Sequence, residues 1–319
     1  MSLSILFAAS GDIAIPTLQV LVSLSPHISL LTAPDKKRGR GMELSFSKIK
    51  EEAIRLGVKH IFQFETLNAE ARKKISNEAS PNFLIAFAYG KLFGPQFLSL
   101  FSMGAINIHP SLLPKYRGPA PLLAAILHGD KSYGISIQKI FAELDTGDIL
   151  ISKEYHLNSN YSTYELTQEA AQHAATLLSQ NFSSILSLYE MAKPQSCEGI
   201  SYAPLVSKED GIIDFKKSAA TICREVKAYH PWPKSYTTYK GTLLFIYQCD
   251  CCEDNSEDYH KSEYGEIFAI DLDKGIKVKC SSGALCIKEL QLAGKKRMNF
   301  TSFLNGNKNI IGTRLGGAI

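Results

Sequence analysis

The sequence predicts an α/β protein with two domains, the first built on a mostly parallel sheet and the second a small β-barrel. Over the first two-thirds of the 319 residues, short apolar runs of strand length alternate with segments of helical periodicity. This alternation is typical of βαβ units, which form a parallel sheet with helices on both faces. In the last third, short strands separated by turn residues replace it, and a barrel is the natural way to close such strands.

The elements of the first domain follow from apolar runs and helix-start signals. Residues 3–8 form a nearly continuous apolar run, which predicts a strand buried on both faces. Ser45 and Ser47 are candidates to cap a helix that begins beside them. The remaining expected strands are 28–32, 59–62, 83–87, 104–108, 134–141 and 149–157, and the expected helices are 13–24, 45–56, 67–77 and 164–188.

The second domain is separated from the first by a segment that lacks periodicity. Residues 191–207 have neither a strand nor a helix pattern, so a linker is expected between a domain of residues 1–190 and one of residues 208–319. Lys240-Gly241 and Ser282-Gly283 are turn signals between strands. The expected elements of the second domain are a helix over 219–228 and strands over 237–239, 243–247, 266–270, 276–280 and 284–290.

The composition is that of an ordinary globular protein, with 45% hydrophobic and 21% charged residues. No run reaches the roughly 18 apolar residues of a membrane helix, so no membrane partner is expected. The apolar N-terminal run has no basic residue before it, which predicts a buried strand rather than a signal peptide. A cytoplasmic protein is therefore expected, with an organelle matrix as the alternative, and a monomer is expected.

Residue spacing disfavours two common chemistries. Among seven cysteines, Cys249 and Cys252 have Cys-x-x-Cys spacing, but no second pair follows at zinc distance, so free thiols and no metal site are expected. Residues 249–263 are expected to form an acidic, cysteine-rich loop to which we assign no role. A dinucleotide site needs Gly-x-Gly-x-x-Gly after the first strand, and the turn there contains one glycine, Gly11. NAD binding is therefore disfavoured.

An amide and an imidazole are predicted at the end of one strand. Side chains alternate along a strand, so Asn107 and His109 point to the same side. The strand ends there because Pro110 cannot donate to the ladder, and ligands of open parallel sheets bind at the carboxyl ends of the strands. An isolated Asn-x-His pair is common, however, and by itself indicates only a solvated strand end.

Two nearby segments strengthen the case for a catalytic site. The proline-rich segment 111–121 predicts a stiff loop, which suits the positioning of a flat ligand. The next turn between predicted strands carries carboxylates, and one of them can orient His109, as base-orienting carboxylates do elsewhere. Spacing alone does not choose between Asp145 and Asp148.

Together these segments resemble the 10-formyltetrahydrofolate-dependent formyltransferases. The resemblance is carried by Asn-Ile-His-Pro-Ser-Leu-Leu-Pro at 107–114, Lys-Tyr-Arg-Gly-Pro-Ala-Pro at 115–121 and Leu-Asp-Thr-Gly-Asp at 144–148. It implies a Rossmann-like sheet domain, 10-formyltetrahydrofolate as formyl donor, no metal, and a catalytic set of Asn107, His109 and Asp145. It also implies a folate site lined by Ser111, Leu112, Leu113 and Pro114, with Ala88, Tyr89 and Gly90 beside the pterin.

Within that superfamily the chain resembles the methionyl-tRNA formyltransferases. Pro34-Asp35 and Gly39-Arg40-Gly41 are similar to the basic loop that this family applies to the acceptor stem. The segments similar to its C-terminal OB-like domain are Tyr202-Ala203-Pro204, Pro231-Trp232-Pro233 and Ala293-Gly294-Lys295-Lys296. The resemblance implies formyl transfer to the methionyl amino group of initiator methionyl-tRNA, for translation initiation. The tRNA contacts that it implies are Arg40, Lys36, Lys37, Arg38, Lys295 and Lys296. Ala9 and Gly11 depart from the family's pattern in the first turn.

In the mechanism that the resemblance implies, Asn107 donates to a tetrahedral oxyanion and Asp145 holds His109 protonated. Two alternatives remain. One is another folate enzyme of the superfamily, either a formyltetrahydrofolate hydrolase or an amino-sugar formyltransferase, and the other is a non-catalytic RNA-binding protein. The set of an amide, an imidazole and a carboxylate favours an enzyme. A basic loop alone is compatible with a solvated surface, because the net charge is only +4.

Overall fold

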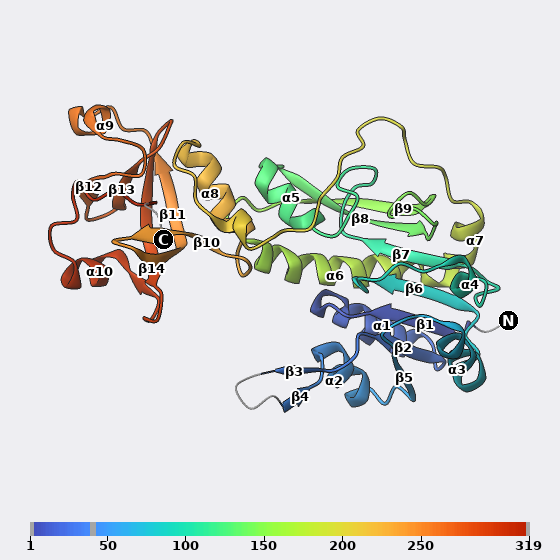
Figure 1. Ribbon diagram of the computed structural model, residues 1–319. Helices are drawn as coiled ribbons and strands as arrows, with labels where there is room; N and C mark the ends of the chain where they lie inside the picture. The colour runs from blue at the N-terminus through green and yellow to red at the C-terminus, as the bar shows by residue number, and fades with distance from the viewer. Residues whose placement is uncertain (1–2, 39–42, 317–319) are drawn as a thin grey trace. The chain divides into compact units, whose positions relative to one another are not determined.

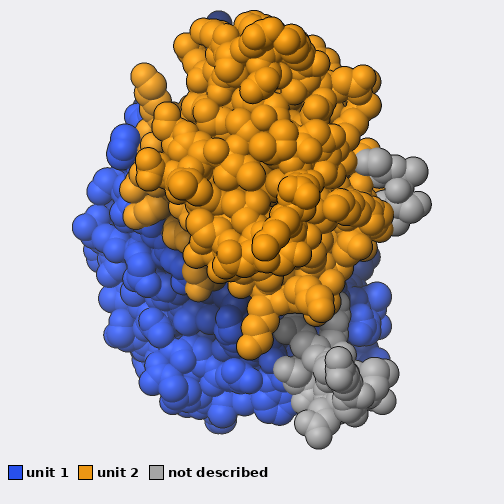
Figure 2. All heavy atoms as spheres, turned by 90° about the vertical axis from the view of Figure 1, so that its left-hand side faces the viewer, with its two compact units in different colours: residues 1–122, 132–156, 167–204 blue, residues 123–131, 157–166, 205–319 orange. Residues whose placement is uncertain are grey.

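The computed structural model describes residues 3–38 and 43–316, and for residues 36–38 and 43–45 it describes the backbone alone. The chain divides into two compact units, coloured separately in Figure 2. The first contains Met1–Leu122, Ser132–His156 and Thr167–Pro204, and the second contains Leu123–Lys131, Leu157–Leu166 and Leu205–Ile319. Each unit is therefore discontinuous in sequence, and two short segments that precede residue 190 group with the C-terminal part of the chain.

The first unit is built on a seven-stranded sheet (Figure 1). Its strands, in spatial order, are β5 (His60–Gln63), β2 (Ile28–Thr32), β1 (Ile5–Ala9), β6 (Phe83–Phe87), β7 (Ala105–His109), β8 (Ser132–Lys139) and β9 (Ile149–His156). The strands from β5 to β7 pair in parallel, and β8 pairs antiparallel with both β7 and β9. The predicted mostly parallel α/β fold is thus confirmed.

Helices account for the unbroken apolar character of the central strands. All residues of β1, β2 and β6 are buried, as expected for parallel strands covered on both faces. The helices along this part of the chain are α1 (Ile15–Leu24), α2 (Lys48–Arg55), α3 (Ala69–Ala79), α4 (Pro95–Leu98), α5 (Pro121–His128), α6 (Thr163–Asn181) and α7 (Ile185–Glu190), with 3-10 turns η1 (Asp12–Ala14) and η2 (Phe182–Ser184).

The start of α2 differs from the prediction. The helix begins at Lys48, and the Ser47 side chain makes no capping hydrogen bond. Its carbonyl instead accepts from the N–H groups of Lys50 and Glu51, which are ordinary helical bonds. Ser45 belongs to β4 (Glu43–Ser45), which pairs with β3 (Lys36–Arg38) in a two-stranded sheet that the sequence did not predict. Helices α4 and α5 were also not predicted.

The second unit contains a separate antiparallel sheet. Its order is β10 (Ser235–Tyr239), β11 (Thr242–Cys252), β14 (Ala284–Leu292), β13 (Gly275–Lys279) and β12 (Ile267–Asp271), with β15 (Met298–Asn299) beside β14. Among the residues that the structure describes, no strand ladder joins β10 to β12, so the predicted closed barrel is not seen. The helical segments are η3 (Glu209–Gly211), α8 (Ala219–Ala228), α9 (Glu257–Lys261) and α10 (Phe300–Gly306).

The predicted acidic, cysteine-rich loop is wrong as a description of residues 249–263. Its first four residues complete β11, and α9 occupies Glu257–Lys261. Apolar contacts explain the longer strand, because Cys249 is buried in the core of this unit with Leu244, Ile246 and Ile287. Within the described ranges, no group of three or more metal-ligating side chains is placed to hold a metal ion, and no helix is long and apolar enough to cross a membrane.

Candidate active site

Strands β7 and β8 present polar side chains on one face at the end of the sheet. Asn107 and His109 alternate along β7, and the antiparallel register pairs them with Gln138 and Ser136 of β8. Residues that are directly opposite in such a ladder point to the same side. His109, Ser136 and Gln138 are buried, and Asn107 is half-buried. Because buried polar groups are normally hydrogen-bonded, we expect these side chains to have specific partners.

The turn between β8 and β9 brings a carboxylate to this face. Asp145 is 7% exposed and His109 is 4% exposed. Oδ2 of Asp145 lies 3.5 Å from Nδ1 of His109, and Nδ2 of Asn107 donates to Oδ1 at 3.3 Å. Asp148 instead faces Lys139, at 3.4 Å between Oδ2 and Nζ. The geometry therefore brings together Asn107, His109 and Asp145, and it places Asp148 elsewhere.

Further donors surround the Asp145 carboxylate. The backbone N–H of Gly118 donates to Oδ2 at 2.8 Å, and Nε2 of Gln138 donates to Oδ1 at 2.9 Å. With Asn107, they offset the large cost of burying a charge. The carboxylate is consequently fixed by hydrogen bonds from both neighbouring strands and from the loop after β7.

His109 faces a hydrogen-bond acceptor at each ring nitrogen. Nε2 lies 2.9 Å from the carbonyl oxygen of Tyr116, and Nδ1 faces Asp145. Burial lowers the pKa of His109, whereas the charge of Asp145 and the Tyr116 carbonyl act in the opposite direction. The net lowering favours a neutral ring near pH 7, which differs from the expectation that Asp145 keeps His109 protonated. A neutral ring can donate from one nitrogen only, and both partners are acceptors. We assign the proton to Nε2 because the carbonyl oxygen of Tyr116 is the closer acceptor, at 2.9 Å against 3.5 Å for Asp145. Nδ1 then has no proton and lies beside the carboxylate.

The loop after β7 is held by Ser136. Its hydroxyl donates to the carbonyl of Ser111 at 2.7 Å and accepts from the N–H of Leu113 at 3.2 Å. The Ser111 hydroxyl donates to the carbonyl of Lys115 at 2.6 Å. Leu112 covers Gly134, where a Cβ would lie 2.3 Å from the leucine side chain. Ser111 and Leu113 are buried, and Leu112 and Pro114 are half-buried.

Residues 88–90 follow β6 at the same carboxyl edge of the sheet. Ala88 and Gly90 are exposed and have positive φ angles of 51° and 81°. The Tyr89 ring is buried and stacks on Phe93 at 5.3 Å. Its hydroxyl has no hydrogen-bond partner among the described residues, and burial raises the pKa of Tyr89 to about 12. This segment thus offers exposed backbone at the sheet edge, while the tyrosine side chain belongs to the core.

The predicted basic residues are described to different extents. Arg40 lies outside the described residues. Lys36, Lys37 and Arg38 form β3, of which the backbone alone is described. Lys295 and Lys296 are exposed in the turn between β14 and β15.

Sequence reasoning missed several groups that hold the site. Gln138 lies on a predicted strand, 134–141, but the sequence did not indicate that this strand pairs with the Asn-x-His strand. The Tyr116 carbonyl and the Gly118 N–H carried no signal, because backbone groups have no sequence signature. Gln195 also contacts the Asp145 turn, and it lies in the segment that had been predicted as a featureless linker.

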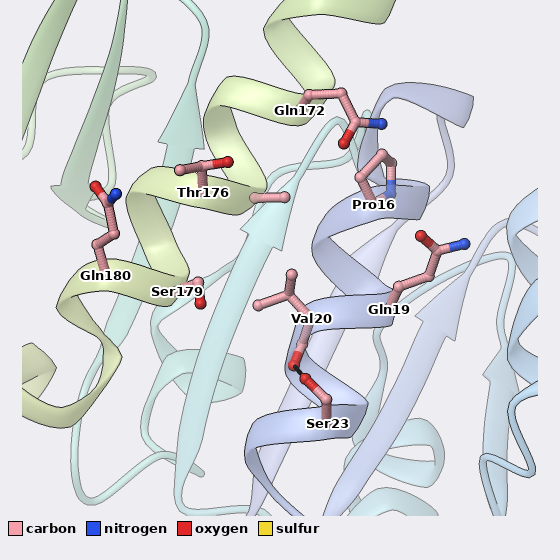
Figure 3. A pocket seen from close by; sticks show the side chains of 9 residues that line it. Pro16, Gln19, Val20, Ser23, Gln172, Thr176, Ser179 and Gln180 are labelled. Carbon is pink, nitrogen blue, oxygen red and sulfur yellow. Dashed lines mark hydrogen bonds between the residues drawn. The ribbon is translucent and has the colours of Figure 1, made fainter.

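A separate groove of about 520 Å³ lies between α1 and α6 (Figure 3). Gln19 and Ser23 line it from α1, and Gln172, Thr176 and Gln180 line it from α6. These amides and hydroxyls do not titrate near neutral pH and are not activated nucleophiles. No residue of the Asn107 site lines this groove.

Two family models match the chain. One, described as formyl transferase, matches residues 20–182, and the other, described as formyl transferase, C-terminal domain, matches residues 205–308. Known crystal structures with the same fold include HypX from Aquifex aeolicus in complex with tetrahydrofolic acid, with a TM-score of 0.62 and 15% identity over 97% of this chain and 48% of that one. WlaRD, a sugar 3N-formyl transferase, has a TM-score of 0.63 and 17% identity over 93% of this chain and 100% of that one.

Curated relatives match over nearly the whole length. The methionyl-tRNA formyltransferase of Borrelia recurrentis is 35% identical over 308 residues, covering 97% of this chain and 98% of the relative. That of Ruminiclostridium cellulolyticum is 35% identical over 317 residues, covering 98% of this chain and 100% of the relative. The chain therefore belongs to the formyl transferase family, among the methionyl-tRNA formyltransferases.

Proposed function

We propose that this protein transfers the formyl group of 10-formyltetrahydrofolate to the amino group of initiator methionyl-tRNA, for translation initiation. The observation that carries the proposal is the cluster of half-buried Asn107 with buried His109 and Asp145 at the carboxyl end of β7. It occurs in a chain that is 35% identical to methionyl-tRNA formyltransferases over nearly its full length.

In the proposed reaction, neutral His109 is the base. Nδ1 accepts a proton from the attacking amine as the new nitrogen–carbon bond forms. The resulting imidazolium has an acceptor at each nitrogen, because Tyr116 O lies beside Nε2 and Asp145 lies beside Nδ1. The same proton then passes to the folate nitrogen as its bond to the formyl carbon breaks. Such positioned acid–base catalysis contributes about 10²–10⁴-fold to a rate.

Asn107 is suited to stabilise the oxyanion. One N–H of its amide donates to Asp145 at 3.3 Å, which fixes the side chain and leaves the second N–H for the formyl oxygen. A fixed donor of this kind is typically worth about two to three orders of magnitude in rate. The carboxylate therefore has two roles: it accepts a hydrogen bond from the Asn107 amide, and its charge stabilises the imidazolium that forms during transfer.

The substrate contacts are part of the same proposal. We place folate against Ser111, Leu112, Leu113 and Pro114 and beside Ala88, Tyr89 and Gly90. Support comes from the position of both segments at the carboxyl edge of the sheet, after β7 and β6. For Tyr89 the contact is through its backbone, because the ring is buried.

For tRNA we propose contacts from Arg40, Lys36, Lys37 and Arg38 in a first basic segment and from Lys295 and Lys296 in the second unit. The assignment of residues 1–190 to catalysis and 208–319 to tRNA binding, joined by 191–207, belongs to this proposal. Lys295 and Lys296 are exposed, as phosphate contacts require.

We also propose that residues 208–319 form an OB-like barrel closed by the end of the chain. The N–H of Leu315 donates to the carbonyl of Gly265 at 2.8 Å, and the N–H of Gly316 donates to the carbonyl of Thr238 at 3.1 Å. One segment thus bonds to residues beside β12 and within β10. Because charged initiator tRNA is the substrate, the proposal places the protein in the cytoplasm, and we expect it to act as a monomer.

An acceptor comparison tests the proposed function. The purified protein is given 10-formyltetrahydrofolate with initiator methionyl-tRNA, with elongator methionyl-tRNA, with a dTDP-linked amino sugar, or with no acceptor. The expected result is N-formylmethionyl product with the initiator tRNA and little turnover otherwise. Equal folate hydrolysis without an acceptor, or transfer to the sugar, would overturn it in favour of another folate enzyme.

A further inference from the structure

Residues 193–203 belong to the first unit, and backbone hydrogen bonds anchor this segment at both ends. Lys193 exchanges backbone hydrogen bonds with Ile149 of β9, at 2.7 and 3.0 Å. At the other end, the N–H of Arg117 donates to Ser201 O at 2.9 Å, and the N–H of Ala203 donates to Arg117 O at 2.8 Å. This part of the predicted linker is therefore attached to the loop after β7.

Between the two anchors, the Gln195 amide bonds to the Asp145 turn. Its Nε2 donates to the carbonyl oxygens of Asp145 at 2.8 Å and Gly147 at 2.9 Å. It also lies 3.2 Å from Oε1 of Gln138. Its Oε1 accepts from Arg117, at 2.7 Å from Nη2 and 3.2 Å from Nε. One half-buried amide thus joins the turn, the β8 strand and the loop after β7.

The Asp145 turn needs such a support. Asp145 has a φ of 56°, a left-handed conformation that costs a non-glycine residue on the order of 1–2 kcal/mol. Residues 141–144 are exposed, so they supply little packing. Gln195 binds the carbonyl of the strained residue itself and the carbonyl of Gly147, two residues later, and these bonds fix the backbone that directs the carboxylate inward.

The other partner of His109 is held by the same segment. The hydroxyl of Ser201 accepts from the N–H of Tyr116 at 2.9 Å, and the carbonyl of Tyr116 faces Nε2 of His109. Residues 193–203 therefore support both acceptors of the imidazole, one through Gln195 and one through Ser201.

We infer that Gln195 is a positioning residue for formyl transfer, whose amide holds the Asp145 turn so that the carboxylate stays beside His109 and Asn107. The catalytic consequence rests on the proposed function, whereas the effect on His109 does not. Gln195 touches neither the imidazole nor the reacting atoms, so it acts through the residues that it holds, and Asp145 is the one that lies beside His109.

Gln195→Met tests this inference, because it keeps the length of the side chain and removes every hydrogen bond. The value of kcat should fall about ten- to a hundredfold, the scale of a small misplacement of a catalytic group. The KM for folate and the melting temperature should stay close to wild type. Gln195→Glu keeps the acceptor for Arg117 and lacks both donors, so its kcat should fall as well. Gln180→Met, an exposed glutamine on α6, is the matched control and should be unchanged.

The pKa of His109 shows whether Gln195→Met displaces the Asp145 carboxylate or only makes the protein less stable. Asp145 raises the pKa of His109, so a loosened turn should lower that pKa further. The acid limb of the kcat profile should therefore move to lower pH in Gln195→Met. The same shift should appear in an NMR titration of His109 in the substrate-free protein, with the signal assigned from His109→Gln.

The two proposals fail in different ways. If wild-type protein formylates no acceptor, the proposed function fails, and the NMR titration still decides the role of Gln195. A His109 pKa in Gln195→Met equal to that of wild type, or a Gln195→Glu variant with full kcat, would overturn the positioning role. A lower His109 pKa in Gln195→Met but not in Gln180→Met would support it.

Discussion

The backbone N–H of Gly118 donates to Oδ2 of Asp145 at 2.8 Å, and this bond joins the loop after β7 to the turn between β8 and β9, across 27 residues of sequence. Gly118 can make it because its φ is 113°, a conformation that glycine adopts at little cost. The space is also restricted, since a Cβ there would lie 2.6 Å from the carbonyl oxygen of Ala203. The loop after β7 therefore determines the position of the carboxylate as well as that of the Tyr116 carbonyl.

Gly118→Ala should therefore impair catalysis and reduce stability together. The left-handed backbone costs about 1–3 kcal/mol for alanine, and the close carbonyl forces the loop to move away from Asp145. We expect a lower melting temperature and a large loss of kcat. Gly57→Ala is the matched control, because Gly57 has a φ of 73° with no atom within 4 Å of the added Cβ. If Gly118→Ala loses no more activity than this control, the Gly118–Asp145 bond does not position the carboxylate.

The activity should remain high into mildly acidic solution. The proposed base is neutral His109, and burial lowers its pKa below the usual value of about 6.5. The rate of the chemical step should fall only when the pH drops through this lowered value. Single-turnover rates measured from pH 5 to 8 test this, with methionyl-tRNA of fixed aminoacylation. A rate that increases as the pH falls below 6.5 would indicate that the protonated ring is the active form.

The lowered pKa of His109 also predicts how the stability of the protein depends on pH. Because the pKa of His109 is lower in the folded protein, the unfolded chain takes up the proton first as the pH falls. The free energy of unfolding should therefore decrease below about pH 6.5 and be insensitive to this residue above it. The pKa values of His173 and His230 are lowered by burial too, so His109→Gln should reduce the slope without abolishing it. An unchanged slope in this variant would contradict the assignment.

Lys295 and Lys296 should contribute salt-dependent affinity for tRNA. Each phosphate contact adds about 0.7–0.9 to the slope of log affinity against log salt. The double variant Lys295→Ala/Lys296→Ala should bind initiator tRNA more weakly, with a slope smaller by about one to two. Lys216→Ala, an exposed lysine of the same unit, serves as the control. Equal slopes for the double variant and wild type would remove these residues from the tRNA surface.

The sequence was informative wherever side-chain pattern determines structure. The apolar runs predicted β2 and β6 at their observed bounds, because strands buried on both faces leave a continuous signal. The Asn-x-His motif could be placed at the carboxyl edge of the sheet because alternation and Pro110 fix its face and its end. These are local properties of the chain.

What could not be predicted depends on contacts between distant segments. Asp145 and Asp148 lie in the same turn between predicted strands, and only the fold directs one toward His109 and the other toward Lys139. Gln195 lies 50 residues from Asp145 in a segment without periodicity, so its hydrogen bonds had no local signature. The protonation state of His109 depends on burial, which a motif does not report.

We propose that Asp145, through His109 and Asn107, makes the end of β7 the site of formyl transfer. The single-turnover rate of formyl transfer to initiator methionyl-tRNA in two matched variants, Asp145→Asn and Asp148→Asn, tests this role. We predict that Asp145→Asn loses at least about a hundredfold in rate, the scale of one electrostatic group in a site, while Asp148→Asn stays near wild type because its carboxylate faces Lys139. Near-normal activity in Asp145→Asn, with an inactive Asp148→Asn, would contradict the assignment of Asp145 as the carboxylate that acts with His109.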